Sequence, residues 1–210
     1  NKWIEGDVKD YKLLRKALEN VAENIGVKII EPLNELGAAK GVSYTNTKEV
    51  ALNPRNSELQ NVKTLVHELT HAKLHSIEKL DKYKPYEKEF QAELTAYTVC
   101  KYVGLDTSEY SINYLYSWTK DKTFDDEKQL LKEVQETSRQ FISIIEDTLI
   151  SEKENSIDKL KENNMNIERN LTMEDAFNTY REYDGREKYK TISKEKENEI
   201  EQMIKSHEKW

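Results

Sequence analysis

The chain has 210 residues, of which 36% are hydrophobic and 35% are charged, and its formal net charge is −7. This acidic balance argues against a general nucleic-acid-binding surface, because affinity for phosphates comes from an excess of lysine and arginine. The single cysteine, Cys100, excludes an intramolecular disulfide and gives no sign of an oxidising compartment, so we expect a cytoplasmic protein. No apolar run reaches the roughly 18 residues of a membrane-spanning helix, and we expect no membrane partner. Because Asn1 is neither an initiator methionine nor part of a signal peptide, the chain resembles an internal piece of a longer polypeptide.

Hydrophobic periodicity and turn residues predict the elements in chain order. In the first half of the chain they predict a helix over residues 10–25, a short strand over 27–30, a β-hairpin with strands over 41–44 and 49–53, and a helix capped by Ser57 that runs to Leu74. In the second half they predict helices over residues 85–103, 110–118 and 124–149. These elements indicate an α+β, mostly helical fold with a small three-stranded sheet.

The composition changes after Ser151, where glutamate, lysine and asparagine dominate and apolar residues become isolated. We therefore expect residues 1–150 to form the folded domain. Residues 151–210 are expected to be a charged, helical and partly mobile C-terminal extension, with short helices that begin near Thr172 and Ser193.

Three of the four histidines lie close together, in the sequence H-E-L-T-H-A-K-L-H that begins at His67. Residues four apart share one helix face, so His67 and His71 can direct their imidazoles at one point. Zinc accepts such nitrogens at about 2.0–2.1 Å, and Glu68 can reach a water on the same ion. The H-E-x-x-H pattern therefore predicts a site for one zinc ion. The alternative is a set of solvated histidines on an amphipathic helix.

A catalytic zinc site needs a third protein ligand and one open position. His75 shares the face of His67 but stands one further turn along the helix, so we expect it beside the ligands rather than on the ion. Glu89 and Glu93 lie four residues apart on the next helix, on a face with small and apolar residues. Burying a carboxylate is costly unless a cation offsets its charge, so we expect one glutamate to reach the metal and the other to orient the ligands. A solvated carboxylate pair is the alternative, and Cys100, too far along this helix for the same ion, is expected to be a buried apolar side chain.

The two motifs resemble a known family. H-E-L-x-H-x-x-x-H, preceded by a hairpin that ends Val50-Ala51-Leu52-Asn53 and followed by E-F-Q-A-E, is similar to the ImmA/IrrE family of zinc metallopeptidases. The residues from Ala92 to Trp118 resemble more closely the metallopeptidase domain of ArdC/LtrC-type antirestriction and polyvalent proteins of phages and conjugative elements. The resemblance covers residues 10–150.

This resemblance implies a zincin-like fold in which the H-E-x-x-H helix packs on a second ligand-bearing helix. In zincins whose second helix carries E-x-x-x-D or E-x-x-A, the first glutamate is the metal ligand, and the matching residue here is Glu89. The implied activity is that of a gluzincin-like zinc metalloendopeptidase, with His67, His71 and Glu89 holding zinc and Glu68 as the general base. Glu93 is then expected beside the ligands.

An oxyanion donor is also needed, and its candidates are Tyr44, Tyr97 and His75. The hairpin strand over residues 49–53 precedes the histidine helix, and we expect it to be the edge strand that binds an extended substrate. By analogy the substrate is a specific regulatory or host protein, and the chain is encoded on a mobile element. The alternatives are a non-proteolytic antirestriction or protein-binding module on the same fold, and a structural zinc domain with an inert site.

Overall fold

The computed structural model describes residues 6–162, with side chains up to residue 159. Its helices are α1 (Tyr11–Asn24), α2 (Glu58–Leu74), α3 (Pro85–Tyr102), α4 (Ser108–Thr119) and α5 (Glu127–Glu162), with a short 3-10 helix η1 (Ile77–Lys79). The strands are β1 (Lys28–Ile30), β2 (Gly41–Tyr44) and β3 (Glu49–Leu52). The mostly helical α+β architecture with three strands is therefore confirmed for the part of the chain that the structure describes.

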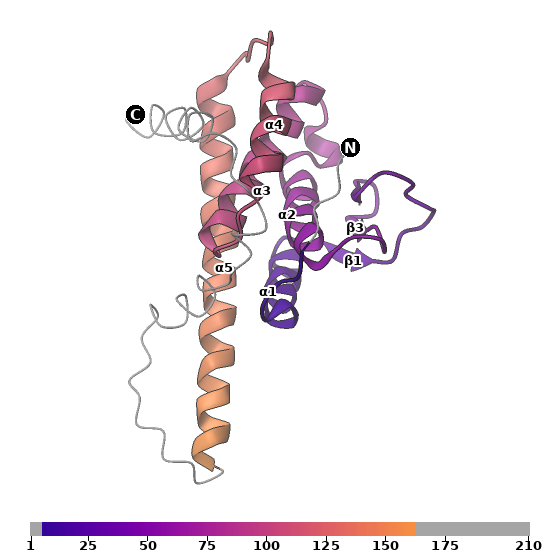
Figure 1. The fold of residues 1–210 in the computed structure, drawn as a ribbon. Coiled ribbons are helices and arrows are strands. Elements are labelled where there is room, and N and C mark those ends of the chain that lie inside the picture. Colours follow the sequence, from indigo (N-terminus) through magenta and orange to yellow (C-terminus); the bar gives the residue numbers. More distant parts are fainter. Residues whose placement is uncertain (1–5, 163–210) are drawn as a thin grey trace.

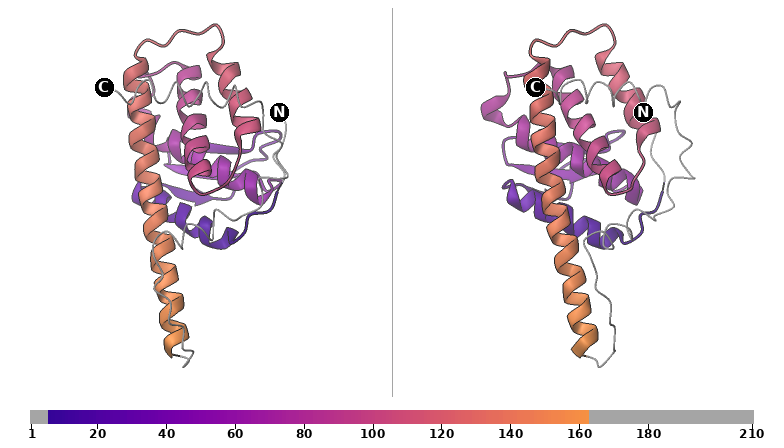
Figure 2. Two further views of the ribbon diagram at one scale, coloured as in Figure 1. Left: turned by 60° about the vertical axis from the view of Figure 1, so that its left-hand side comes forward. Right: turned by 90° about the vertical axis from the view of Figure 1, so that its left-hand side faces the viewer.

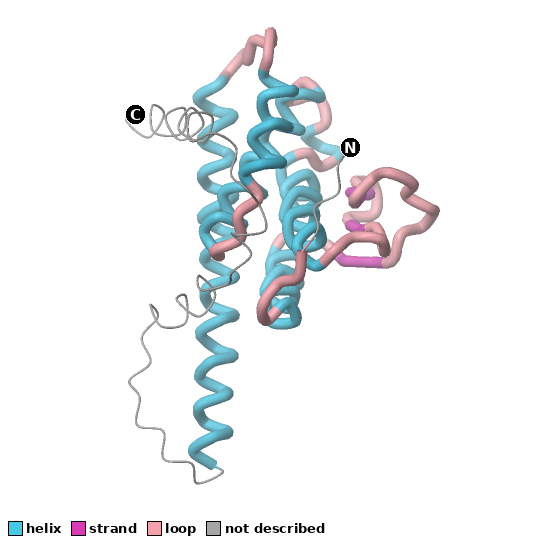
Figure 3. Tube along the Cα trace, viewed as in Figure 1, coloured by secondary structure: helices cyan, strands magenta, loops and turns pink. Residues whose placement is uncertain are grey.

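The sheet has the strand order β1-β3-β2, in which β1 pairs parallel with β3 and β2 pairs antiparallel with β3. The strands gather at one side of the helices (Figure 3). The hairpin strand β3 is thus the central strand, and the expectation that it forms the edge beside the histidine helix is wrong. The short hydrophobic strand β1 covers one side of β3, and β2 is left at the edge.

Two helices begin with local hydrogen bonds that the sequence makes available. The Ser57 hydroxyl accepts a hydrogen bond from the Gln60 backbone N–H at 3.1 Å, which caps α2. At the start of α3, Pro85 occupies the first turn, and the buried Glu87 carboxylate accepts from the Lys84 N–H at 2.8 Å. These caps fix where α2 and α3 begin and therefore which of their side chains face each other.

Helix α2 contacts the sheet on one side and α3 on the other, and α3 in turn contacts α4 and α5 (Figures 1 and 2). One buried apolar cluster joins α1, α2 and α5, with Leu18, Leu65 and Phe141 among its members. A second cluster lies among α3, α4 and α5 and includes Phe90 and Leu130. Each such fully buried side chain contributes about 1.5–3 kcal/mol relative to leaving it exposed, so α5 is an integral part of the packed fold.

Helix α5 is longer than the sequence predicts. The expected end near Leu149 is wrong, because α5 continues to Glu162, and Figure 1 shows its C-terminal end extending past the other helices. The residues after Ser151 are rich in glutamate and lysine, which favour a helix even where no apolar face needs burial. The short helices expected from Thr172 and Ser193 lie outside the described residues. Within residues 6–162, no helix combines the length and apolar character needed to cross a membrane.

Candidate metal centre

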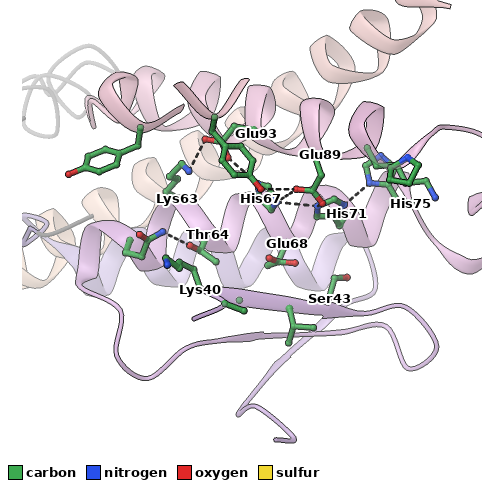
Figure 4. Close-up of a pocket in the computed structure, with 18 of the residues that line it drawn as sticks. Lys40, Ser43, Lys63, Thr64, His67, Glu68, His71, His75, Glu89 and Glu93 are labelled. Atoms are coloured by element: carbon green, nitrogen blue, oxygen red, sulfur yellow. Dashed lines mark hydrogen bonds and ion pairs between the residues drawn. The ribbon is translucent and has the colours of Figure 1, made fainter. Parts of the chain in front are cut away.

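Helix α2 presents two imidazoles at one point of its surface. His67 and His71 stand one turn apart, and their Nε2 atoms lie 3.1 Å from each other (Figure 4). The Nδ1 atom of His67 is 3.2 Å from the Glu93 carboxylate, and the Nδ1 atom of His71 is 2.8 Å from the Nδ1 of His75. Both rings therefore use Nδ1 for contacts within the protein and turn Nε2 toward the same space.

Helix α3 brings a carboxylate to the same point. Glu89 Oε2 lies 3.5 Å from His67 Nε2, and Glu89 Oε1 lies 3.4 Å from His71 Nε2. One ligand atom from each of these three side chains can be chosen so that all lie within 4.8 Å of one another. Two nitrogens from one helix and an oxygen from the next thus form a triangle of possible metal ligands.

The dimensions and chemistry of this triangle fit a tetrahedral zinc ion. Bonds of about 2.0–2.1 Å at tetrahedral angles separate neighbouring ligand atoms by ~3.3–3.4 Å. The two Nε2 atoms are 3.1 Å apart, and each lies 3.4–3.5 Å from a different oxygen of the Glu89 carboxylate, so this carboxylate faces both nitrogens at about that separation. Two imidazoles and one carboxylate are also a donor set that zinc accepts in catalytic sites.

The surroundings of His67 and Glu89 shift the pKa values of both side chains toward their charged forms. Burial disfavours a charged His67, but hydrogen bonds to Glu89 and Glu93 and the charge of Glu68 outweigh it and raise the pKa of His67 to about 10. For Glu89, burial again opposes the charge, and the contacts with His67 and His71 hold its pKa well below the ordinary value. The contacts between these groups therefore favour a protonated His67 and an ionised Glu89.

Glu93 is buried beside His67 and on the side away from the triangle. Its Oε1 forms an ion pair with Lys63 at 2.7 Å, and its Oε2 contacts His67 Nδ1 (Figure 4). Burial opposes its charge, but the Lys63 ammonium and the hydrogen bond to His67 lower the pKa of Glu93 to about 2. An ionised carboxylate at Nδ1 requires that His67 donates there, so Nε2 is the nitrogen that a metal would take in place of a proton.

His75 is the C-cap of α2 and is buried. Its Nδ1 contacts His71 and its Nε2 contacts the side-chain oxygen of Gln91 at 2.8 Å, so neither nitrogen faces the triangle. Burial, followed by the charge of His71, lowers the pKa of His75 to about 3. A neutral His75 thus lies next to a ligand candidate, as the sequence spacing predicts.

The triangle opens into a cleft of about 940 Å³ between α2, β2, α3 and α4. Glu68 lines this cleft between the two histidines and strand β2 (Figure 4). Burial raises the pKa of the Glu68 carboxyl above its ordinary value, although the charges of His67 and His71 oppose the shift. Strand β2 approaches α2 very closely here, because a Cβ built on Gly41 would lie 3.0 Å from Glu68 Cγ.

A hydroxyl group that contacts the triangle belongs to Tyr114 of α4, which the sequence analysis does not single out. Its hydroxyl donates to Glu89 Oε2 at 3.3 Å, and its ring lines the cleft. Burial and the charge of Glu89 raise the pKa of Tyr114 to about 12, so the hydroxyl keeps its proton. The aromatic stretch of α4 has no spacing signal that separates Tyr114 from its neighbours.

Two other tyrosines named from the sequence do not line the cleft. The Tyr44 hydroxyl accepts from the Leu33 backbone N–H at 3.2 Å. Tyr97 is buried in the apolar cluster with Phe90, and its hydroxyl accepts from Lys101 Nζ at 3.2 Å. Cys100 is buried in the core, where burial raises the pKa of its thiol to about 12, and it also does not line the cleft.

A comparison with protein families agrees with this geometry. Residues 22–113 match the Peptidase_M78 family model, described as an IrrE N-terminal-like domain. This segment is therefore similar to the ImmA/IrrE type of domain. It includes α2, α3 and the first half of α4, and hence every residue of the triangle. The match shows that this segment is similar to a metallopeptidase-like domain.

A curated relative extends the similarity beyond this segment. The chain is 34% identical over 163 residues to the uncharacterized protein pXO2-81 of Bacillus anthracis, a match that covers 73% of this chain and 28% of the relative. The chain therefore spans less than a third of the length of that protein. No solved structure is a significant match. The comparisons do not support the closer resemblance to ArdC/LtrC-type proteins, or an antirestriction role or a mobile-element origin.

Proposed function

We propose that this chain is a zinc-dependent metallopeptidase in which His67, His71 and Glu89 hold one zinc ion and Glu68 is the general base. The observation that carries the proposal is the triangle itself. Its two Nε2 atoms and one carboxylate converge at separations that match a tetrahedral zinc site, at the edge of an open cleft. A bound zinc ion would lower the pKa of a water toward ~7 and polarise the scissile carbonyl.

Glu68 is suited to move the proton of that water. It is adjacent to His67 in the chain and lines the same cleft, and its raised pKa brings it nearer to the pH at which it must accept and return a proton. In the proposed reaction it takes the proton of the attacking water and passes it to the leaving amine. Tyr114 is the proposed oxyanion donor, because its protonated hydroxyl lies beside Glu89 and the residue lines the cleft.

Strand β2 supports an extended polypeptide as the substrate. Asn53 N–H donates to the Lys40 carbonyl at 2.8 Å, so Lys40 and Asn53 form a hydrogen-bonded pair of the antiparallel ladder. Such pairs alternate with non-bonded ones, and the register places Gly41 opposite Leu52 in the next pair. The backbone groups of Gly41 therefore point away from β3, at the sheet edge that lines the cleft, where a substrate strand can add.

The test compares the zinc-loaded parent with Glu68→Gln on a peptide library read by mass spectrometry. We expect both proteins to bind one equivalent of zinc and only the parent to produce cleavage products. Glu136→Gln, the same change on the exposed face of α5, is the matched control and should cleave like the parent. Equal cleavage by Glu68→Gln and the parent would show that the general-base assignment is wrong.

A further inference from the structure

A chain of buried hydrogen bonds leads from His71 to helix α5. His71 Nδ1 contacts His75 Nδ1 at 2.8 Å, and His75 Nε2 contacts Gln91 Oε1 at 2.8 Å. The Gln91 side-chain N–H groups donate to the Leu130 carbonyl at 3.1 Å and to Glu133 Oε2 at 3.0 Å. Three elements, α2, α3 and α5, thus meet in one polar path through the interior.

The orientation of the Gln91 amide follows from its partners on α5. The Leu130 carbonyl and the ionised Glu133 carboxylate only accept hydrogen bonds, so the NH₂ group of Gln91 must face them. Turning the amide over would place three acceptor oxygens together. The Gln91 oxygen is therefore the atom that faces His75.

This orientation determines the protonation pattern of both histidines. Since Gln91 Oε1 only accepts, His75 must carry its proton on Nε2, and the Nδ1 of neutral His75 is then an acceptor. The hydrogen bond between the two Nδ1 atoms consequently needs a donor from His71. With its proton on Nδ1, His71 has its Nε2 lone pair directed into the triangle of ligand atoms.

We infer that Gln91 is a positioning residue through which α5 sets the metal-binding tautomer of His71. This inference rests on the proposed metal site and deepens it. Leu130 and Glu133 lie outside residues 22–113, the segment that matches the family model, so this anchor is a feature of the longer chain. Lys82 pairs with Glu133 at the outer end of the path and holds the carboxylate in its ionised form.

Glu133 orients the Gln91 amide by accepting a hydrogen bond from it, as Glu93 orients the His67 ring by accepting from Nδ1. Each metal-ligand candidate on α2 therefore has its Nδ1 proton fixed from outside the triangle, His67 directly by a carboxylate and His71 through two intervening side chains. Removing a hydrogen-bond partner that orients a metal ligand typically weakens metal binding about 10–100-fold. The loss of Gln91 should therefore appear as weaker zinc binding.

The experiment combines histidine tautomer assignment by imidazole ¹⁵N chemical shifts in the metal-free protein with zinc affinity by chelator competition. In the parent, His75 should resonate as the Nε2–H tautomer. In Gln91→Met this preference should be lost and zinc should bind about 10–100-fold more weakly. Gln140→Met, the same change on α5 away from the site, should match the parent in both measurements.

An Nδ1–H tautomer of His75 in the parent would overturn the inference. So would a zinc affinity of Gln91→Met equal to that of the parent. Glu133→Ala provides a second variant if Gln91→Met does not fold, and it should shift the His75 tautomer and weaken zinc binding in the same direction. The tautomer measurement needs neither metal nor substrate, so its result stands apart from failure of the proposed peptidase activity.

Discussion

Replacing Gly41 by alanine tests the close contact between β2 and α2. A Cβ at this position would lie 2.6 Å from Thr64 Cγ2, 3.0 Å from Glu68 Cγ and 3.1 Å from the Ala51 carbonyl oxygen. Carbon atoms in contact normally stand about 3.5–4.0 Å apart, so the new methyl group overlaps Thr64 by about 1 Å. Either β2 moves away from α2, or the side chains of Thr64 and Glu68 shift.

Overpacking of this kind costs about 1–3 kcal/mol of unfolding free energy, which a urea titration of the metal-free protein measures. A displacement of Glu68 by about 1 Å is expected to reduce kcat/KM for peptide cleavage about 100-fold. Zinc affinity should change by only a few-fold, because His67, His71 and Glu89 lie on α2 and α3. The expected signature is therefore a large loss of cleavage with nearly intact metal binding.

Two further variants separate the displacement of Glu68 from a general loss of stability. Gly37→Ala places a side chain at φ +57° with nothing within 4 Å, so it should cost ~1–2 kcal/mol through the backbone alone and leave cleavage unchanged. Adding Thr64→Ser to Gly41→Ala removes the atom at 2.6 Å and keeps the hydroxyl that accepts from Gln60, so it should restore part of the stability. If Gly41→Ala is as stable and as active as the parent, β2 does not hold Glu68 in place.

Four more predictions concern the metal site. Glu89→Ala should abolish binding of one zinc equivalent in equilibrium dialysis, whereas Glu93→Ala should still bind it, about 10–100-fold more weakly. Equal losses in the two variants would contradict the assignment of Glu89 as the ligand. His71→Ala should likewise lose the ion while His75→Ala keeps one equivalent, and loss in both would make His75 a ligand. Because the pKa of His67 is raised to about 10, zinc must displace its proton, so apparent affinity should rise about tenfold per unit between about pH 7 and 9. The same raised pKa stabilises the metal-free fold at pH values below 6.5, the ordinary pKa of histidine. Urea titrations should show this contribution to the free energy of unfolding decline as the pH rises from 6.5 toward 10.

The local parts of the fold could be predicted because they depend on neighbouring residues. Ser57 caps α2 as its position before an amphipathic run indicates, and the four-residue spacing of His67 and His71 needs only helix geometry. The hairpin of β2 and β3 follows from two short strands around a turn. Each of these features is encoded within about ten residues of the chain.

The features that sequence reasoning missed depend on contacts between distant segments. The position of β3 at the centre of the sheet comes from its parallel pairing with β1, about twenty residues earlier, and no local pattern specifies that partner. Tyr114 reaches Glu89 only because α4 folds back over α3. Helix α5 passes Leu149 because its glutamate and lysine residues favour a helix without needing a buried face.

The polar residues of α3 are unexpected at its central position and need a separate explanation. Residues 91–97 are all buried, so this helix is enclosed by α2, α4 and α5 and a purely apolar sequence would be expected there. Gln91 and Glu93 are nevertheless polar. Gln91 contacts His75 at the end of α2 and Leu130 of α5, and Glu93 contacts His67 and Lys63, both on α2. Apolar residues at both positions would remove the cost of burying polar groups, so stability alone does not account for them. Their common effect is to fix the Nδ1 protons of His67 and His71, which a packed core does not require and a metal site does.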